Sequence, residues 1–245
     1  MRNIEHVSPF ERKHFDLSSV TIHPHHINIA SLLGCSLTDL QIKGLSGALS
    51  GSSITVDFQH LGQTVGSEYI PPGLYFQVEN LTYIRSRNVI GLFRDNPSGL
   101  GIYINSVDFR PGQGLRGLAA RMLAVMIRHA FQVPQIKRIC LLAAGGRSWP
   151  PLDPNTGERW GGFIAWPTYG FDMQIPRHTA NIAPEFPYYP EEIISRQKVS
   201  EVISIAGGRD YWKIVGDGDY MDFDLSSKST QSIVTLDSFL GKAGI

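Results

Sequence analysis

Hydrophobic and polar positions change their spacing along the chain, and the first clear pattern is that of β-strands. From residue 53 to residue 109, apolar positions come in short runs that are separated by turn residues. Runs of this kind are typical of an antiparallel meander. The predicted strands cover residues 54–58, 74–78, 83–85, 89–93 and 100–109, with a strong turn signal at 95–99.

Helical spacing follows the last of these strands after a glycine-rich turn. Apolar residues then recur every three or four positions up to His129, and Pro134 ends the pattern. A continuous apolar run follows at 136–144, which is typical of a strand buried on both faces. The order strand, helix, strand predicts a βαβ-type unit whose two strands are parallel and adjacent. The residues that form the apolar side of the helix are Leu115, Leu118, Met122, Val125, Met126 and His129.

A glycine-rich turn, residues 110–119, connects the predicted strand to this helix. Its sequence is RPGQGLRGLA. A strand that turns through glycines into a helix leaves several N–H groups pointing the same way, with the positive end of the helix dipole behind them. That geometry suits a phosphate group, to which Arg110 and Arg116 would add charge-assisted hydrogen bonds. The alternatives are a tight turn with solvated arginines, or a dinucleotide site, for which the full Gly-x-Gly-x-x-Gly spacing is missing.

The stretch from Trp149 to Pro190 is rich in proline and aromatic residues. Within it, five aromatic side chains fall in twelve residues, and they either line an acceptor pocket or cover the open end of the sheet. Beyond this stretch the pattern predicts one short helix from Glu191 to Ala206 and another from Ser232 to Leu240. The five aromatic residues are Trp160, Phe163, Trp166, Tyr169 and Phe171.

Composition narrows the class of protein only modestly. The 245 residues are 42% hydrophobic and carry 22 basic and 22 acidic side chains, so no overall basic field points to nucleic acid. An anion site must therefore be local. A nucleic-acid-binding module would need the arginines to form one basic face, and a steep salt dependence of affinity would be its signature. The arginines concerned are at positions 110, 116, 121, 128, 138 and 147.

Neither the start of the chain nor its cysteines and histidines point to a special compartment or to a metal. Residues 1–16 are polar and lack the apolar segment of a signal peptide, and no window reaches the roughly 18 apolar residues of a membrane span, so we expect a cytoplasmic protein. Cys35 and Cys140 are predicted to be buried thiols. Three histidines at 23, 25 and 26 are interrupted by Pro24 and have no carboxylate or thiol nearby in sequence, which favours a surface turn over a metal site.

Two motifs together carry a resemblance to a known family. Gly117-Leu118-Ala119 stands at the end of the glycine-rich turn, and Gly170-Phe171-Asp172 follows the aromatic stretch. With these motifs and the helix and strand between them, residues 53–180 resemble the GCN5-related N-acetyltransferase (GNAT) superfamily. In that family a loop of pattern Gln/Arg-x-x-Gly-x-Gly/Ala holds the pyrophosphate of acetyl-coenzyme A. Here Gly114 stands where the family has Gln or Arg, and Gln113 is one position away.

The resemblance implies an α/β (α+β) fold with a mixed, mainly antiparallel sheet and a central helix after the glycine-rich loop. The expected organisation is an N-terminal extension (1–52), the acetyltransferase-like domain (53–180) and a C-terminal extension (181–245). The implied function is transfer of an acetyl group from acetyl-coenzyme A to an amine of a small molecule or a protein, by direct attack. A catalytically inactive binding or structural protein of the same fold is the alternative. The residues expected to bind the coenzyme are Arg110, Gln113, Gly114, Arg116, Gly117, Leu118 and Ala119.

Acetyl transfer also needs a base for the amine and a proton for the leaving thiolate. Asp108 is the carboxylate on the strand that leads into the loop, which makes it the candidate base, with Asp57 and Glu79 on earlier strands as weaker alternatives. Trp166 occupies the position where the family frequently has its general-acid tyrosine. The neighbouring Tyr169 is therefore the candidate proton donor.

Overall fold

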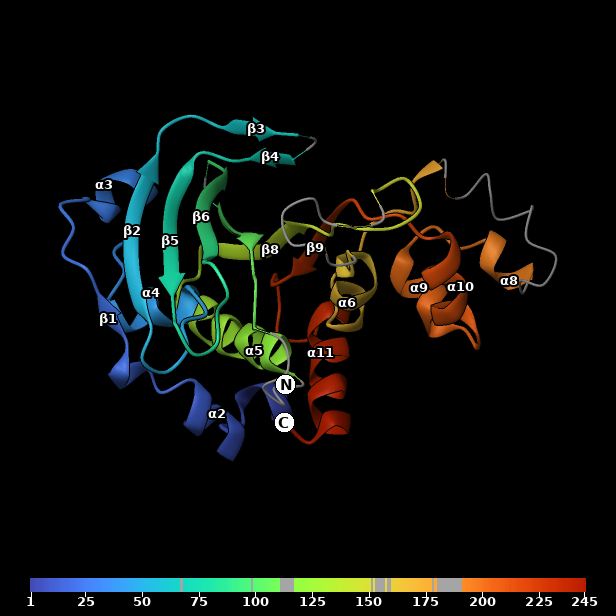
Figure 1. Cartoon of the computed structure of the whole chain (residues 1–245), viewed down its shortest axis with the longest axis horizontal. Helices are drawn as coiled ribbons and strands as arrows, with labels where there is room; N and C mark the ends of the chain where they lie inside the picture. Colours follow the sequence, from blue (N-terminus) through green and yellow to red (C-terminus); the bar gives the residue numbers. More distant parts are fainter. Residues whose placement is uncertain are drawn as a thin grey trace. The chain divides into compact units, whose positions relative to one another are not determined.

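The computed structural model describes residues 1–66, 68–97, 99–110, 117–150, 152, 157, 160–177, 179 and 191–245. These residues form two compact units (Figure 1). The first unit contains residues 1–139 and 224–245, and the second contains residues 140–223. The chain therefore returns to the first unit after completing the second. The three-part division predicted from the sequence stays a prediction.

The described strands form one large sheet and one small hairpin. The large sheet is seven-stranded, in the order β1-β2-β5-β6-β7-β8-β9, and β3 pairs only with β4. Strand β1 is parallel to β2, whereas β2, β5, β6 and β7 are successively antiparallel. The mixed, mainly antiparallel sheet predicted from the sequence is thus confirmed. The strands are β1 (Thr21–Ile22), β2 (Ser53–Gln59), β3 (Gln63–Val65), β4 (Glu68–Ile70), β5 (Gly73–Glu79), β6 (Asn88–Asn96), β7 (Gly99–Ser106), β8 (Ile136–Leu142) and β9 (Tyr220–Asp224).

One face of the strands in the first unit is almost entirely apolar. Because side chains alternate between the two faces of a strand, Ile54, Phe76 and Ile90 all point to the same side. Helices α4 (Asp39–Leu45) and α5 (Leu118–Ala130) lie alongside these strands (Figure 1). The buried side of α5 and the apolar face of the sheet form the core of this unit. Its fully buried members include Leu74, Phe76, Ile90, Leu92, Ile102, Met122, Val125 and Met126.

The opposite face of the same strands is polar and aromatic. Tyr75, Gly91 and Tyr103 are paired across β5, β6 and β7, so they lie in one row on this face. A side chain at Gly91 would collide with the ring of Tyr75, whose Cε1 would lie 2.5 Å from a Cβ at this position. Glycine therefore allows the tyrosine ring to lie across the middle strand. We call this surface the polar face.

The predicted strand–helix–strand unit is present as β7, α5 and β8. Strands β7 and β8 are neighbours in the sheet, and the amide of Leu100 donates to the carbonyl of Gln135 at 2.8 Å. This bond brings the beginnings of the two strands side by side, as expected for a parallel pair joined by a helix. The helix begins at Leu118 and ends at Ala130, close to the predicted bounds.

Helices from both ends of the chain pack around α5. They are α1 (Arg2–Glu5), α2 (Pro9–His14) and α11 (Gln231–Ala243), and both α1 and α11 contact α5. Local capping explains where α2 and α11 begin, because the hydroxyls of Ser8 and Thr230 accept bonds from the amides three residues later. A 3₁₀-helix (Leu17–Ser19) and α3 (Ile29–Leu33) complete the N-terminal region.

The second unit is built around aromatic residues. The indole of the buried Trp212 donates to the carbonyl of Phe163 at 2.9 Å, and the rings of Phe171 and Phe223 lie 5.4 Å apart. These contacts join residues 163–171 to α10 and to β9. The described helices of this unit are α6 (Gly162–Thr168), α8 (Glu191–Ile194), α9 (Val199–Ser204) and α10 (Gly208–Val215).

Several element predictions were wrong. Residues 83–85 form no strand, and only Ile84 makes an isolated bridge, to Phe109. The single helix expected at 191–206 is two helices, α8 and α9, separated by residues 195–198. Of the two cysteines predicted to be buried, Cys140 is buried and Cys35 is only partly so.

Candidate functional site

The turn that was predicted to bind phosphate lies between the end of β7 and the beginning of α5, and both elements belong to the first unit. Gly117 is the N-cap of α5 and has a left-handed backbone with φ of 88°. Such a conformation favours glycine, because a Cβ would be strained there. No side chain in the described part of the chain caps this helix end, and its first turn holds no acidic residue. The amides of the first turn therefore remain able to donate to an anion.

The residues predicted to bind the coenzyme divide into two groups. Gln113, Gly114 and Arg116 lie outside the described residues. Leu118 is buried, whereas Gly117 and Ala119 are partly exposed at the helix start. A side chain at Gly117 would overlap that of Ile245, so this helix end is closely packed on one side.

Arg110 is the first residue of the predicted loop, and it is anchored to another segment. Its amide donates to the carbonyl of Tyr83 at 2.9 Å, and its Nε donates to the carbonyl of Ile84 at 3.0 Å. The residue is nevertheless exposed. These bonds fix the entry to the loop against residues 83–84 and leave the end of the guanidinium at the surface.

Asp108, the predicted base, contacts the segment before β6. Its carboxylate lies 3.6 Å from Nε of Arg85 and accepts a hydrogen bond from the hydroxyl of Ser86 at 3.3 Å. Its own amide donates to the side chain of Asn88 at 2.8 Å. The side chain is 28% exposed, so solvent and a ligand have access to it. Asp108 therefore also joins the end of β7 to residues 85–88.

Tyr169, the predicted proton donor, belongs to the second unit. Its ring lies 6.1 Å from that of Trp166 in an edge-on arrangement. Burial raises the pKa of its phenol above the ordinary value, because the charged phenolate would be poorly solvated. The hydroxyl therefore stays protonated at neutral pH and can serve as a proton donor.

The Gly170-Phe171-Asp172 motif forms the turn after α6. Gly170 has φ of 100°, a conformation in which glycine is strongly preferred. Phe171 is fully buried, and Asp172 exchanges two backbone hydrogen bonds of 2.9 Å with Asp222. The carboxylate of Asp172 also accepts from the amide and hydroxyl of Ser200, at 3.0 and 2.7 Å. The motif therefore organises the second unit: its phenylalanine fills the core and its aspartate caps α9.

The aromatic stretch has a mixed environment in the second unit. Phe163 and Phe171 are buried, while Trp160, Trp166 and Tyr169 are partly exposed. The ring of Trp166 lies 5.2 Å from that of Phe171. Part of the stretch is thus core, and the three partly exposed rings remain able to contact a ligand.

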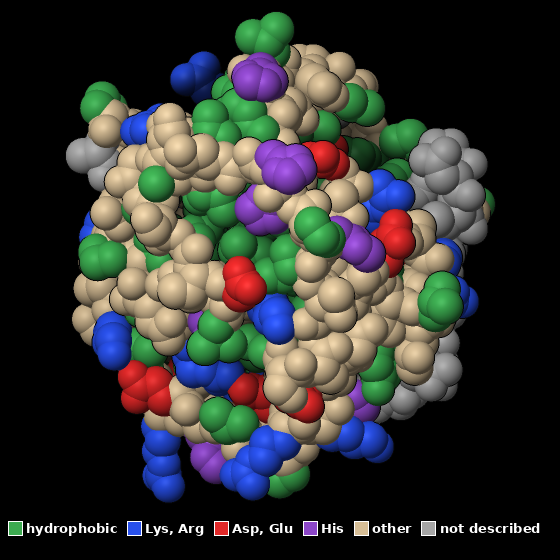
Figure 2. All heavy atoms as spheres, turned by 90° about the vertical axis from the view of Figure 1, so that its left-hand side faces the viewer, with side chains coloured by type: hydrophobic (Ala, Val, Ile, Leu, Met, Phe, Trp, Pro, Cys, Tyr) green, Lys and Arg blue, Asp and Glu red, His purple; other side chains and the backbone are tan. Residues whose placement is uncertain are grey.

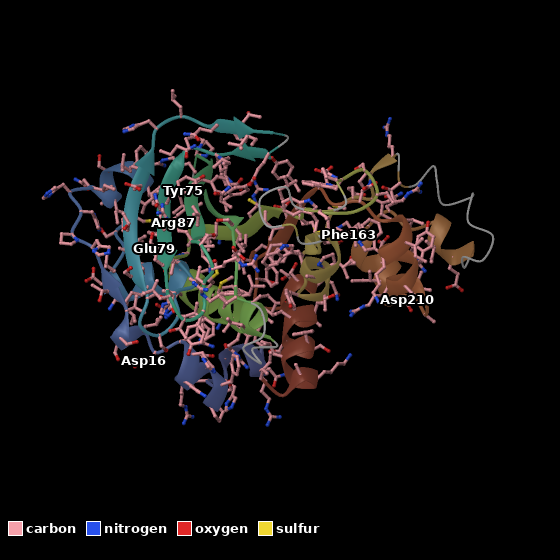
Figure 3. All side chains as sticks on the ribbon, in the orientation of Figure 1. Asp16, Tyr75, Glu79, Arg87, Phe163 and Asp210 are labelled. Atoms are coloured by element: carbon pink, nitrogen blue, oxygen red, sulfur yellow. The ribbon has the colours of Figure 1, made fainter. Side chains whose placement is uncertain are left out.

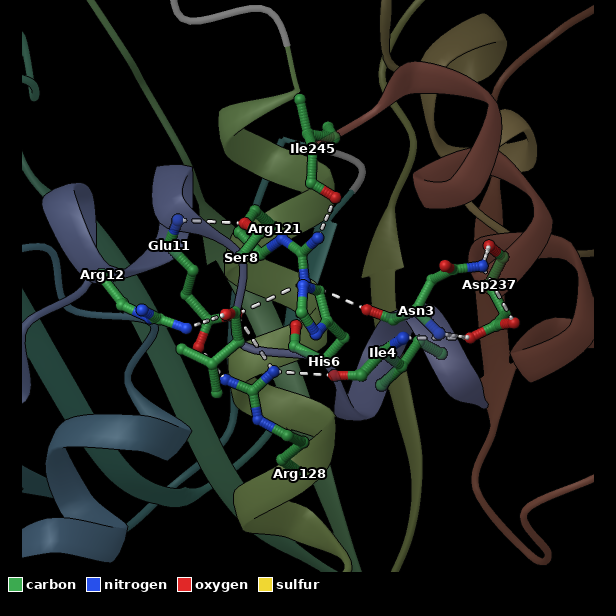
Figure 4. Close-up of polar contacts among 11 residues, drawn as sticks. Asn3, Ile4, His6, Ser8, Glu11, Arg12, Arg121, Arg128, Asp237 and Ile245 are labelled. Atoms are coloured by element: carbon green, nitrogen blue, oxygen red, sulfur yellow. Dashed lines mark hydrogen bonds and ion pairs between the residues drawn. The ribbon is translucent and has the colours of Figure 1, made fainter.

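A buried ionic cluster holds α5 against the N-terminal helices (Figure 4). Glu11 of α2 pairs with Arg121 at 3.3 Å and with Arg128, and both arginines project from α5. Arg121 also donates to the carbonyls of Asn3 and His6, each at 3.1 Å, and to that of Ile245. Because these donors are directed at protein carbonyls, Arg121 positions the helix and is not directed at a ligand.

A second polar cluster lies on the polar face and was missed by sequence reasoning. Glu68 of β4 accepts hydrogen bonds from the hydroxyl of Tyr103 and, at 3.1 Å, from the side-chain amide of Asn105. Alternation along β7 places Tyr103 and Asn105 on one face, which the sequence does indicate. No local signal indicates that Glu68, 35 residues earlier, contacts Tyr103.

Histidine side chains gather on the side of the chain that carries β1, β2 and α3 (Figure 2). This region contains His23, His25, His26 and His60 in the sequence. Among the described residues, no group of three or more His, Cys, Asp and Glu side chains is placed to hold a metal ion. No helix in the described ranges is both long and apolar enough to cross a membrane.

Comparison with known proteins gives one structural likeness. No family model matches the chain, and no curated protein matches it. Among solved structures, the chain is similar to the loading GNATL domain of CurA from Lyngbya majuscula, with 14% sequence identity and a TM-score of 0.27. The match covers 62% of this chain and 76% of the other. Because the identity and the TM-score are this low, we base no functional step on the likeness.

Proposed function

We propose that the chain binds acetyl-coenzyme A at the turn before α5 and transfers the acetyl group to an amine. The observation that carries this proposal is the junction of β7 and α5. There a left-handed glycine, Gly117, starts a 13-residue helix that no described side chain caps. Free amides at the positive end of a helix dipole fit the pyrophosphate of coenzyme A. The GNAT-like Gly-x-Ala and Gly-Phe-Asp motifs support the same conclusion.

The proposed reaction is direct attack of the amine on the thioester. The nitrogen lone pair forms a bond to the carbonyl carbon, the carbon–sulfur bond breaks, and the thiolate leaves. One proton is lost from the amine to a base, and the thiolate gains one proton from a donor. This route needs no covalent intermediate on the protein.

Asp108 and Tyr169 are the proposed base and proton donor. Asp108 combines partial exposure with a position at the end of β7, next to the predicted coenzyme loop. Tyr169 carries a phenolic proton at neutral pH, and burial raises its pKa further. Both assignments belong to the proposal, and each can be tested separately.

A binding or structural protein without catalytic activity is the second candidate. The contacts of Asp108 favour it, because Arg85 and Ser86 engage the carboxylate as they would in a purely structural link. The cytoplasmic location and the small-molecule or protein nature of the acceptor likewise remain proposals.

A thiol-release assay with acetyl-coenzyme A and a panel of primary amines tests the catalytic proposal. We expect amine-dependent release of coenzyme A, and a loss of turnover of about 100-fold or more in Asp108→Asn and in Tyr169→Phe, as is typical when general acid–base catalysis is removed. Asp210→Asn is the matched control, because Asp210 is an exposed carboxylate whose partner is Lys213 on the same helix. If Asp108→Asn and Tyr169→Phe both turn over as fast as Asp210→Asn, Asp108 is not the base and Tyr169 is not the proton donor. No release with any amine, in a protein that binds coenzyme A, would favour the non-catalytic alternative.

A further inference from the structure

Glu68 is held on the polar face by two donors from the same strand. The hydroxyl of Tyr103 and Nδ2 of Asn105 both donate to Oε1 of Glu68. An ionised carboxylate can only accept hydrogen bonds, and it has two oxygen atoms with which to do so. With both donors on Oε1, the other oxygen, Oε2, is left for a further donor.

The position of Glu68 within its hairpin is unusual. The residues of β3 are all exposed, and Tyr69, the next residue in β4, is 52% exposed. Glu68 is instead partly buried, and its partner Tyr103 is only 1% exposed. Glu68 and Ile70 of β4 are therefore both partly buried, whereas Tyr69 and the residues of β3 remain in solvent.

The charges around Glu68 leave it without a cationic partner. In the described part of the chain, Glu68 has no Lys, Arg or His within ion-pairing distance. Two other carboxylates of this face do have one: Glu79 pairs with Arg87 at 3.0 Å, and Asp95 pairs with Arg138. Figure 3 shows Tyr75 and Glu79 of β5, with Tyr75 nearer to the β3–β4 hairpin, and Arg87, which directly precedes β6. A carboxylate without a counter-charge in the protein can pair with a cation that a ligand supplies.

We propose that Glu68, Tyr103 and Asn105 form the binding site for the primary ammonium group of the acceptor. This inference rests on the proposed acetyl transfer to an amine and narrows the acceptor to one that carries a cation. Oε2 of Glu68 accepts from the ammonium, while the buried Tyr103 and the side-chain amide of Asn105 hold the carboxylate in place through Oε1. Glu68 binds and orients the acceptor, while proton removal is left to the base.

Binding of a simple diamine tests this site without the acetyl donor. Isothermal titration of 1,5-diaminopentane into the full chain should show saturable binding, and the neutral, similarly shaped 1,5-pentanediol should not bind. Glu68→Gln should lower the affinity for the diamine about 10- to 100-fold, which corresponds to the loss of one hydrogen bond to a charged group. Glu79→Gln is the matched control, because that carboxylate lies on the same face but is paired with Arg87.

Two further variants separate the roles within the cluster. Tyr103→Phe keeps the ring and removes the hydroxyl, so it should weaken the diamine less than Glu68→Gln does. Asn105→Ala should have a similar, smaller effect. Thermal unfolding of each variant checks that the fold is intact. If Glu68→Gln does not fold, the titrations of Tyr103→Phe and Asn105→Ala decide the outcome. An unchanged affinity for the diamine in both variants would overturn the proposed site.

Coenzyme A titrations on the same proteins separate this inference from the proposed function. Coenzyme A affinity should be the same in wild type and Glu68→Gln. If the diamine binds through Glu68 but coenzyme A does not bind at all, the acetyltransferase proposal fails and the ammonium site stands. If coenzyme A binds but the diamine fails to bind, or binds equally to Glu68→Gln, the ammonium site is overturned. In an active enzyme, Glu68→Gln should raise KM for the amine and leave kcat nearly unchanged.

Discussion

Single residues of α5 show how closely this helix is packed. The ring of His129 lies against Gly44 of α4, where even a methyl group on the glycine would come within 2.0 Å of the ring. His129 is 8% exposed, and its Nδ1 has no hydrogen-bond partner among the described residues. Burial, and then the neighbouring Arg128, lower the pKa of this histidine below its ordinary value. The imidazole is therefore neutral in the folded protein at pH 7.

This environment predicts a loss of stability in mild acid. As the pH falls below the ordinary value of about 6.5, the unfolded chain takes up a proton on this histidine before the folded chain does, and unfolding becomes easier. His14, whose pKa is also lowered by burial, acts in the same direction. The contribution of one histidine cannot exceed about 1.4 kcal/mol per pH unit.

Urea unfolding at pH 7.5 and pH 5.5 measures this effect. The free energy of unfolding should be lower at pH 5.5 in the wild type, and the difference should shrink in His129→Leu, which removes the titrating group. An unchanged pH dependence in this variant would show that His129 does not sense the pH in the folded state.

At the scale of elements, one buried carboxylate, Glu11, joins α2 to α5. Glu11 is 6% exposed and Arg121 is 1% exposed, so removing the negative charge leaves a buried arginine with less compensation. We expect Glu11→Gln to lower the free energy of unfolding by about 3–5 kcal/mol, the usual effect of breaking a buried ion pair. Chemical denaturation of the full chain gives this value.

The matched control for Glu11 is Glu5, which pairs with Lys228 at the surface. Both side chains of this second pair are more than half exposed, and Glu5→Gln should cost less than about 1 kcal/mol. Equal effects of the two substitutions would mean that the buried cluster does not hold the helices on α5.

The sequence predicts those elements that carry their own signal. β7, α5 and β8 follow from a change in apolar spacing within one continuous stretch, and Gly117 marks the helix start. The terminal helices α1 and α2 have four and six residues, too few for a helical period to be recognised. The hairpin of β3 and β4 was missed because all residues of β3 are exposed, so no alternation between apolar and polar residues marks it.

The candidate site shows the same limit. Asp108, Arg110 and Gly117 could be selected because they stand next to one another in the sequence around a recognisable turn. Glu68 could not, because its contact with Tyr103 is created by the fold of the hairpin over the sheet. For Asp108, the sequence indicates a carboxylate near the end of the strand. It does not indicate the contacts of that carboxylate with Arg85 and Ser86.

At the scale of the whole molecule, the described chain forms two units, with the candidate coenzyme site in the first. The polar face with Glu68 belongs to the same unit, whereas Tyr169 and the Gly170-Phe171-Asp172 motif belong to the second. The first unit therefore contains the proposed binding groups for both the acetyl donor and the amine. Tyr169, the proposed proton donor, belongs to the second unit.

The central claim is that the start of α5 binds the pyrophosphate of coenzyme A, and isothermal titration tests it most directly. Coenzyme A should bind the full chain with a measurable Kd, and pantetheine, which has the thiol arm but no pyrophosphate, should bind at least about tenfold more weakly because it lacks the charge-assisted hydrogen bonds. Absence of coenzyme A binding at millimolar concentration, or equal affinity for the two ligands, would contradict the claim.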